Sequence, residues 1–371
     1  MTKKILYTAS TETHFRSFHI PYLKLFKELG FEVHVAYKGE ELLPYSDKVW
    51  TIPFERTPFN IKNIGAYKKL KKIIDENDYT LIHCHTPTAS VITRLAAIRA
   101  RKKGTSVLYS VHGFHFFKGA PLKYWLFFFP IEWLLSRTAD AIITSNAEDY
   151  NNLVSNKFPV KDKYKTNGLG INDERLTLDQ YNYQEVRKEL GYTSDDVVLL
   201  YIAEFNPGKR HEFILDALPK LIQTSPNIKL LFAGGGMLLD TMKKKALELK
   251  IDKNITFLGF KPNIGKYIKI ADLGISASNR EGFGIGVAEI LTNSIPVIVT
   301  GIRGHTEFVF HNENGFLFEV DNEKQFVDSV LKLVQNKELR REMGDRGGEL
   351  IKKYSVHNTV EEMKKIYLKY V

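Results

Sequence analysis

Residues 278–300 read SNREGFGIGVAEILTNSIPVIVT, and this stretch decides the fold of the second half of the chain. A glycine-rich turn leads into an apolar segment and then a β-branched run, which predicts a loop, a helix and a strand of an α/β sheet. Two acids, Glu281 and Glu289, lie eight positions apart. In one ideal helix they would be about 12 Å apart along the axis, whereas two carboxylates serving one scissile bond need about 5 to 9.5 Å. We therefore expect them to hold two different parts of one long ligand.

Three glycines lie between these acids, at Gly282, Gly284 and Gly286. Without side chains they let backbone N–H groups approach a ligand where the helix N-terminus carries its positive dipole end. A phosphate or diphosphate fits there, so the stretch indicates a sugar and a ribose joined through a diphosphate, which is a nucleotide sugar. The alternative is a tight turn with two solvated surface acids. A lone glycine-rich turn would favour that alternative, and the paired acids disfavour it.

Length, composition and charge indicate how many domains the chain forms and what kind of partner it meets. With 371 residues the chain is long enough for two domains, and 12% aromatic and 43% apolar residues indicate a globular protein. Residues 1–170 contain 25 Lys and Arg against 15 Asp and Glu, whereas the remaining 201 residues contain 28 of each. This asymmetry suggests that the first domain faces an anionic partner, either a membrane or nucleic acid. Nucleic acid is disfavoured because the basic residues are dispersed along predicted helices without a recognised motif.

Three further features concern the compartment. The N-terminus turns polar too early for a secretory signal, and the single cysteine, Cys84, cannot form an internal disulfide, so we expect a cytoplasmic protein. The aromatic run YWLFFFPIEWLL at 124–135 is 12 residues long, whereas a membrane span needs about 20. Flanked by Lys118, Lys123 and Arg137, it has the composition of a helix that lies on a membrane surface. A buried helix of the first domain is the equally weighted alternative.

The alternation of strands and helices predicts two doubly wound Rossmann-like domains. Strands are expected in the first half at 4–8, 31–37, 48–53, 80–83, 106–110 and 139–144, and in the second half at 197–203, 229–233, 255–258, 273–276 and 296–300. The alternation breaks near Gly168 and Gly170, which suggests a hinge. We expect an N-terminal domain of residues 1–167 with a returning C-terminal helix of 355–371, and a C-terminal domain of residues 168–354, with ligand sites at strand ends facing one cleft.

Several residues that come directly after predicted strands are candidates for binding or catalysis. His83 and His85 would point to one face of an extended segment, which also suits a metal, but no second cysteine or carboxylate lies nearby, so loop histidines are the preferred interpretation. His112 precedes a glycine that permits close approach to a ligand, and it could contact a transferred sugar or be a satisfied core histidine.

In the second half, several residues follow strand ends. Lys209 and Arg210 come after the first strand and should overhang the cleft, where a cation would meet the diphosphate; Arg210 is more plausibly a solvated surface charge. The glycine run 234–236 is a second strand-to-helix turn, of which Gly234 and Gly235 are expected at the donor. The segment around Phe260 and Lys261 could take the nucleobase. No DxD motif occurs, so the usual carboxylate grip on a metal-bound sugar nucleotide is missing and no metal or other cofactor is expected.

Several of these motifs together resemble the retaining GT-B glycosyltransferases of family 4. The segment Glu281-Gly282-Phe283-Gly284 with Glu289 is similar to their E-x7-E signature. Four further segments resemble the capsular and exopolysaccharide branch, namely FHIPYLKLFKELGFEVHVA (18–36), IHCHTPTAS (82–90), VHGFHFFKGAP (111–121) and GIRGHTEFV (301–309). The similarity spans almost the whole chain, from Lys4 to about Tyr354.

The resemblance implies a role for each matching residue of the donor site. Glu281 would contact the donor sugar hydroxyls, Glu289 the ribose hydroxyls and Lys209 the diphosphate. The backbone at Phe283 and Gly284 would assist Lys209.

His112 would contact the transferred sugar. The acceptor is expected at Thr11, His14, His85 and His115. The family transfers a sugar with retention and without a metal, and in this branch the acceptor is usually an undecaprenyl-diphosphate-linked saccharide. The donor is expected to be a UDP-sugar, and the enzyme to sit peripherally on the inner face of the plasma membrane.

One departure from the family matters. Many relatives carry a Gly-Arg pair where this chain has Ala203 and Glu204. The residue that supplies the second positive charge to the diphosphate is therefore unassigned, with Arg280 and Arg210 as candidates. Glu204 would weaken donor binding if it faced the phosphates. This change is also the motive for the rival hypothesis, a non-catalytic glycosyltransferase-like scaffold.

Overall fold

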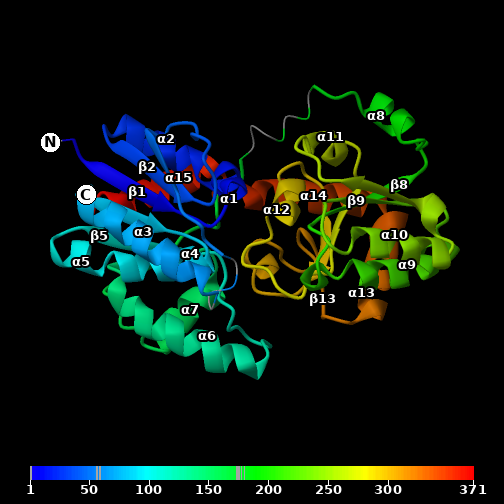
Figure 1. Cartoon of the computed structure of the whole chain (residues 1–371). Coiled ribbons are helices and arrows are strands. Elements are labelled where there is room, and N and C mark those ends of the chain that lie inside the picture. The colour runs from blue at the N-terminus through cyan, green and yellow to red at the C-terminus, as the bar shows by residue number, and fades with distance from the viewer. Residues whose placement is uncertain (1, 56, 58–59, 173–175, 177, 179) are drawn as a thin grey trace. The chain divides into compact units, whose positions relative to one another are not determined.

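The computed structural model describes residues 2–55, 57, 60–172, 176, 178 and 180–371 (Figure 1). The chain divides into two compact units. Unit 1 consists of Met1–Gly170 together with Val356–Val371, and unit 2 consists of Ile171–Ser355. The divisions expected from the sequence, after residues 167 and 354, lie three residues and one residue before these.

Unit 1 is built on a parallel sheet that, in the described part of the chain, has seven strands in the order β3-β2-β1-β4-β5-β6-β7. These strands are β1 Lys4–Thr8, β2 Glu32–Tyr37, β3 Lys48–Thr51, β4 Leu81–Cys84, β5 Ser106–Val111, β6 Ala141–Thr144 and β7 Asp162–Lys165. The helices of unit 1 are α1 Glu12–Phe18, α2 Ile20–Glu28, α3 Lys62–Glu76, α4 Pro87–Ala96, α5 Ile98–Lys102, α6 Leu122–Leu135, α7 Ala147–Ser155 and α15 Val356–Tyr367.

Alternate residues of each strand supply two apolar layers. Ile5 and Tyr7 of β1 belong to a cluster with residues of α2 and α15, including Phe26 and Tyr367. Leu6, between them, packs into a second cluster with residues of α3 and α4. Successive side chains of a strand point to opposite faces, so a strand without polar alternation has to be covered on both sides.

The C-terminal helix α15 completes unit 1. It lies beside α2 (Figure 1). The Tyr367 hydroxyl is 2.5 Å from the Tyr7 hydroxyl and 2.9 Å from His83 Nδ1, and all three side chains are buried. The expected return of the C-terminal helix to the first domain is therefore confirmed.

Unit 2 repeats the arrangement, with six described strands, all parallel, in the order β10-β9-β8-β11-β12-β13. They are β8 Val197–Ile202, β9 Ile228–Ala233, β10 Ile255–Gly259, β11 Leu273–Ser276, β12 Val297–Thr300 and β13 Gly315–Phe318. Its helices are α8 Tyr183–Glu189, α9 His211–Thr224, α10 Leu239–Glu248, α11 Gly265–Ile268, α12 Ile285–Leu291, α13 Glu323–Gln335 and α14 Lys337–Ile351.

Each sheet therefore has the strand order of a Rossmann domain, which confirms the predicted α/β class. The order reverses next to β1 in unit 1 and next to β8 in unit 2. Ligands of such sheets bind beyond the carboxyl ends of the strands at this reversal. The loops after β8 and β11 in unit 2, and after β1 and β4 in unit 1, leave their sheets at these reversals.

Helix α6, which contains the aromatic run, packs some of its side chains into the core and exposes others. Trp125, Phe128, Phe129 and Trp133 pack against a buried cluster of unit 1, whereas several other apolar side chains of the helix are exposed. The helix is therefore partly a core helix of the first domain, and its contact with a membrane stays a prediction. No helix in the described ranges is long and apolar enough to pass through a bilayer.

A buried ion pair fixes α6 to the unit. Arg94 of α4, which is 0% exposed, donates to Glu132 Oε2 at 2.9 Å, and the Tyr109 hydroxyl donates to Glu132 Oε1 at 3.3 Å. The guanidinium also lies 4.1 Å from the centroid of the Tyr109 ring. Breaking one side of such a pair leaves an uncompensated charge in the core.

We predict that Glu132→Ala lowers the free energy of unfolding by about 3–5 kcal/mol, because Arg94 loses its partner inside the protein. Denaturant unfolding measures the change. The double variant Arg94→Met/Glu132→Leu should recover much of the loss, since apolar replacement of both partners is often neutral. Lys324→Ala, which removes an exposed ion pair with Asp328, is the control and should change the stability far less. An equally small cost for Glu132→Ala would contradict this assignment.

Candidate functional site

Strand pairing brings together Lys209 and Glu281, which are 72 positions apart. Leu199 and Leu200 of β8 pair with Leu273 and Gly274 of β11, so the loops after these strands leave the sheet side by side. Lys209 ends the 3₁₀ turn η3, Pro207–Lys209, and Glu281 lies in the loop before α12. Lys209 Nζ donates directly to Glu281 Oε1. The structure thus joins the two residues that the sequence assigned to the diphosphate and to the sugar.

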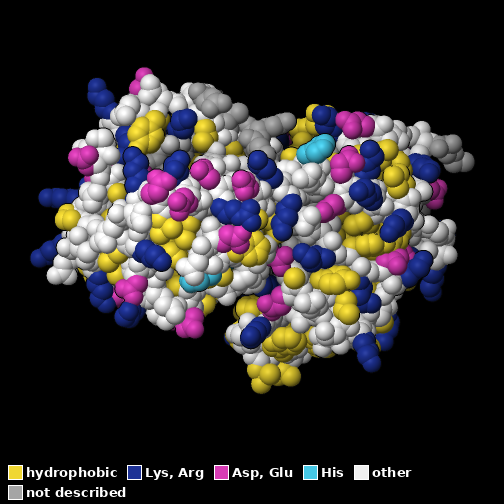
Figure 2. Space-filling model, turned by 180° about the vertical axis from the view of Figure 1, so that it is seen from behind, with side chains coloured by type: hydrophobic (Ala, Val, Ile, Leu, Met, Phe, Trp, Pro, Cys, Tyr) yellow, Lys and Arg dark blue, Asp and Glu magenta, His cyan; other side chains and the backbone are white. Residues whose placement is uncertain are grey.

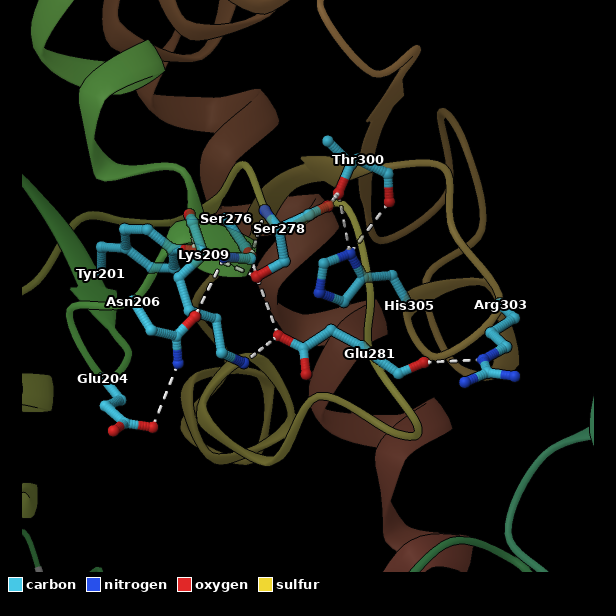
Figure 3. Close-up of polar contacts among 11 residues, drawn as sticks. Tyr201, Glu204, Asn206, Lys209, Ser276, Ser278, Glu281, Thr300, Arg303 and His305 are labelled. Carbon is cyan, nitrogen blue, oxygen red and sulfur yellow. Dashed lines mark hydrogen bonds and ion pairs between the residues drawn. The ribbon is translucent and has the colours of Figure 1, made fainter. Parts of the chain in front are cut away.

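A buried hydroxyl network holds this ion pair (Figure 3). Ser278 Oγ donates to Glu281 Oε1 at 2.8 Å. The Tyr201 hydroxyl donates to the Lys209 carbonyl at 2.6 Å and lies 3.1 Å from Ser278 Oγ. Tyr201 therefore ties the backbone of one loop to the side chain that orients the acid of the other. Sequence reasoning missed both Tyr201 and Ser278, because neither belongs to a recognisable spacing.

The carboxylate of Glu281 is kept ionised despite its burial. Burial alone would raise its pKa, but the nearby Lys209 ammonium, His305 and the hydrogen bonds from Lys209 and Ser278 outweigh that effect and hold the pKa below its usual value. The site therefore presents a fixed negative charge against a fixed positive one.

The loop after Glu281 has the expected shape for close approach. Gly284 is the N-cap of α12 with φ of +92°, in the left-handed region that favours glycine. Phe283 is buried against Phe308 and Tyr354, so its side chain supports the loop and its backbone remains the candidate for ligand contact. Glu289, in α12, is only 3% exposed. The alternative of two solvated surface acids is therefore wrong.

The segment GIRGHTEFV (301–309) contacts the backbone of the same loop. Arg303 Nε donates to the Glu281 carbonyl at 3.1 Å. His305 Nδ1 donates to the Thr300 carbonyl at 2.9 Å, and a Cβ on Gly284 would lie 3.0 Å from the His305 ring. The motif was recognised in the sequence, but nothing in its spacing assigned these positioning roles.

The glycine run after β9 has a packing reason of its own. A Cβ on Gly234 would lie 1.9 Å from the Ala203 carbonyl oxygen, and the Phe205 amide donates to the Gly235 carbonyl at 2.7 Å. These glycines therefore let two loops of unit 2 touch. Their predicted contact with a donor stays a prediction.

The remaining candidates of unit 2 lie around these loops. Glu204 is exposed and accepts a hydrogen bond from Asn206 Nδ2 at 3.1 Å. Phe260 and Lys261 are exposed, Gly282 and Arg280 are half-buried, and Gly282 lies next to Glu281 in the loop. Arg210 forms an ion pair with Asp321 on the surface, as the sequence favoured.

Unit 1 gathers five histidines, which we call the histidine cluster: His14, His19, His83, His85 and His112. His85 follows β4, His112 follows β5, and these strands are neighbours. His85 Nδ1 lies 3.2 Å from His112 Nε2, and His14 Nδ1 lies 2.9 Å from His19 Nε2. The rings of His19 and His85 are 4.0 Å apart between centroids.

The cluster contains three of the predicted residues and omits others. His14, His85 and His112 meet in it. Thr11 caps α1 by accepting from the His14 amide at 3.4 Å, and His115 stacks on Phe128 of α6 with ring centroids 4.4 Å apart.

His19 was missed, although its position in TETHFRSFH, five residues after His14, was visible. Ring nitrogens of His14, His19 and His112 lie within 4.8 Å of one another, which among the described residues is a group that could hold a metal. His83 and His85, the pair considered from the sequence, do not form such a group, because both ring nitrogens of His83 are hydrogen-bonded. Nδ1 contacts the Tyr367 hydroxyl, and Nε2 lies 2.9 Å from Ser110 Oγ.

Burial keeps these rings neutral. It lowers the pKa of His14 to about 4 and that of His83 to about 3. Burial, together with the neighbouring imidazoles, also holds the pKa values of His19, His85 and His112 well below the usual value.

Two family models match this chain. A family model described as "Glycosyl transferases group 1" matches residues 182–350, and one described as "Glycosyl transferase 4-like" matches residues 4–146. EpsD of Bacillus subtilis (strain 168), whose name describes a glycosyltransferase, is 41% identical over 100% of this chain and 98% of its own length. An Escherichia coli enzyme named UDP-Gal:alpha-D-GlcNAc-diphosphoundecaprenol alpha-1,3-galactosyltransferase is 22% identical over 83% of this chain and 80% of its own.

A solved structure shows the same fold. HepE of Anabaena, in complex with UDP and glucose, superimposes with a TM-score of 0.81 and 17% identity, over 99% of this chain and 100% of that one.

We predict that stability falls as the pH is lowered from about 6.5 to 5. Unfolded histidines take up protons below about 6.5, whereas buried His14 and His83 stay neutral down to about 4 and 3, so acid favours the unfolded state. Each such group contributes up to about 1.4 kcal/mol per pH unit. Denaturant unfolding across this range measures the slope, and His83→Gln should reduce it. A flat profile would contradict the neutral cluster.

Proposed function

Because this chain belongs to the group 1 glycosyl transferases, we propose that it moves a sugar from a UDP-sugar to a lipid-linked saccharide during capsular or exopolysaccharide synthesis. The observation that carries the proposal is the Lys209–Glu281 ion pair beside the glycine loop at Gly284. One ammonium group and one carboxylate, both fixed, suit a ligand with a diphosphate at one end and hydroxyls at the other. The UDP complex of HepE supports the choice of nucleotide.

Donor binding exchanges partners within this pair. Lys209 turns from Glu281 to the diphosphate, and Glu281 then accepts hydrogen bonds from the sugar hydroxyls. The backbone N–H groups of Phe283 and Gly284 assist at the donor, and Glu289 takes the ribose hydroxyls. Before the donor arrives the two charges neutralise each other, so neither is left buried alone.

The proposed transfer proceeds with retention of configuration and without a metal. The bond from the anomeric carbon to the phosphate oxygen breaks, and a bond to the acceptor oxygen forms on the same face. The acceptor hydroxyl proton passes to the departing phosphate. Negative charge grows on that leaving oxygen, so a preorganised Lys209 lowers the barrier more than it strengthens ground-state binding.

Lys209→Ala and Glu281→Ala should each lower turnover by about 10²–10³-fold, the usual cost of removing one preorganised group. Release of UDP from a panel of UDP-sugars, with melting to check folding, measures the effect. Lys220→Ala, which removes an exposed ion pair with Glu323, is the matched control and should be as active as the wild type. Near wild-type turnover of a folded Lys209→Ala variant would refute the assignment.

The acceptor side of the proposal rests on unit 1. Thr11, His14, His85 and His115 are proposed to bind the acceptor saccharide, and His112 to contact the transferred sugar. The E. coli relative is named for a diphosphoundecaprenol-linked saccharide, which supports an acceptor of the same class here. Such a lipid is held in a membrane, so the enzyme is proposed to work from the cytoplasm on the inner face of the plasma membrane.

Helix α6 is the proposed membrane contact. Its exposed apolar residues recur along one face, with Leu126 64% and Phe127 61% exposed. Hydrophobic side chains gather at the lower edge of the molecule where this helix lies (Figure 2). Lys123 in the first turn of the helix, and Lys118 and Arg137 beyond its two ends, are exposed. An apolar face bordered by cations is the pattern of a helix that rests in the interface of an anionic membrane.

The double variant Leu126→Glu/Phe127→Glu should lower the affinity for vesicles of anionic phospholipid at least about tenfold, since each side chain loses an apolar transfer of about 1.5–3 kcal/mol. Sedimentation with vesicles measures binding. Leu247→Glu, at a leucine of α10 in unit 2 that is 62% exposed, is the control. Equal binding of the double variant and the control would reject α6 as the contact.

A further inference from the structure

His305 of unit 2 has a fixed tautomer and a ring nitrogen that nothing satisfies. Its Nδ1 donates to the Thr300 carbonyl at 2.9 Å, so Nδ1 holds the proton of the neutral ring and Nε2 is left with a bare lone pair. The residue is fully buried, and Nε2 makes no hydrogen bond to the described residues. Buried polar atoms normally have a partner, so this nitrogen requires an explanation.

The ring packs against the loop 281–284. A Cβ on Gly284 would lie 3.4 Å from His305 Nε2, so this nitrogen faces the backbone at the start of α12. A Cβ on Gly304, the residue before His305, would lie 2.7 Å from Glu281 Cβ. In the close-up the ring lies between Thr300 and Glu281 (Figure 3). A charge on Nε2 would therefore act on Glu281 and on the loop that is proposed to hold the diphosphate.

In the free protein this ring is neutral. Burial holds the pKa of His305 below its usual value although the Glu281 carboxylate opposes it, and the Lys209 ammonium group adds to the lowering. Lys209 and Glu281 form an ion pair, so their charges cancel. Arg303, two residues before His305, donates through Nε to the Glu281 carbonyl at 3.1 Å. Nothing in this balance calls for a charge on the ring.

Binding of the nucleotide sugar changes the balance. In the proposed function Lys209 turns from Glu281 to a diphosphate whose two phosphates are ionised. The Lys209 ammonium group then faces at least three negative charges, one on each phosphate and one on Glu281. A nearby negative charge favours the protonated imidazole, and the effect is strong in a buried place where the effective dielectric constant is low.

We propose that binding of the diphosphate makes His305 take up a proton at Nε2, and that the imidazolium supplies the second positive charge of the site. The proton comes from the solvent, and no bond of the nucleotide sugar is made or broken in this step. Arg210, a candidate for that charge in the sequence, pairs with Asp321 instead. The inference rests on the proposed function, because that function supplies the diphosphate and moves Lys209.

His305 acts through Glu281 and the loop backbone without touching the ligand, so it is a positioning residue. The test counts the protons that the full-length protein takes up when UDP binds. Titration calorimetry at pH 7, in buffers of different ionisation enthalpy, gives this number for the wild type and for His305→Gln. The glutamine amide can still donate to the Thr300 carbonyl but takes up no proton. Any change in the protonation of UDP is the same for both proteins and cancels in the difference.

We expect the wild type to take up as much as about one proton more than His305→Gln. The same uptake makes binding depend on pH. Between the pKa values of His305 in the free and the bound protein, the ratio of the wild-type Kd to the variant Kd should rise up to about tenfold per pH unit. Measurements from pH 6.5 to 8.5 check this slope.

A direct readout on the wild type covers the case in which His305→Gln fails to fold. In ¹⁵N NMR spectra, saturating UDP should convert His305 Nε2 from a bare nitrogen into a protonated one. A structural role alone would leave this nitrogen bare.

His211 provides the matched control. It is a second buried histidine of unit 2, its two ring nitrogens make no hydrogen bond to the described residues, and it stacks on Phe205 with ring centroids 3.8 Å apart. Burial and the Lys209 ammonium group lower its pKa to about 3. Since it lies at the start of α9 and not against Glu281, His211→Gln should keep the proton uptake.

Equal uptake in the wild type and in His305→Gln, loss of uptake in His211→Gln alone, or a bare His305 Nε2 in the UDP complex would overturn the inference. Each of these results is obtained with UDP bound, so the proposed function would stand, with a permanent cation such as Arg280 as the second charge. Absence of UDP binding by the wild type would reject the proposed function itself.

Discussion

Parallel pairing of neighbouring strands is the constraint from which both groups of polar residues follow. Strands that run the same way release their loops at the same edge of the sheet, and the reversal of strand order leaves room there. In unit 2 the pairing of β8 with β11 sets Lys209 against Glu281, and in unit 1 the pairing of β4 with β5 sets His85 against His112. Each contact joins residues that are distant in the sequence, and neither would survive a change of strand order.

The two units use opposite electrostatics for their polar groups. The carboxylate of unit 2 remains charged in a buried place because an ammonium group and a hydroxyl stabilise it, which suits recognition of an ionic ligand. The imidazoles of unit 1 are held neutral by burial and by one another, which suits an uncharged, hydroxylated ligand.

Much of the fold could be predicted, because apolar strands alternating with amphipathic helices give a strong periodic signal. The strands β7 and β13 escaped notice: Asp162–Lys165 reads DKYK, which is mostly charged, and Gly315–Phe318 is short and begins with glycine. The acids of the E-x7-E pattern and Lys209 were visible as motifs, but their direct contact was not, since pairing between distant loops leaves no local trace. Likewise, the sequence showed an aromatic helix α6 without showing that Trp125 and Phe128 face inward while Leu126 and Phe127 face out.

The return of α15 to unit 1 has a consequence for biosynthesis. Tyr7 bonds to Tyr367, so the first unit is built from two segments, one that leaves the ribosome before unit 2 and one that leaves it after unit 2. Unit 2 is a single continuous segment and can fold while synthesis continues. The usual vectorial order is thereby inverted, because unit 1 begins to emerge first but is completed only after unit 2.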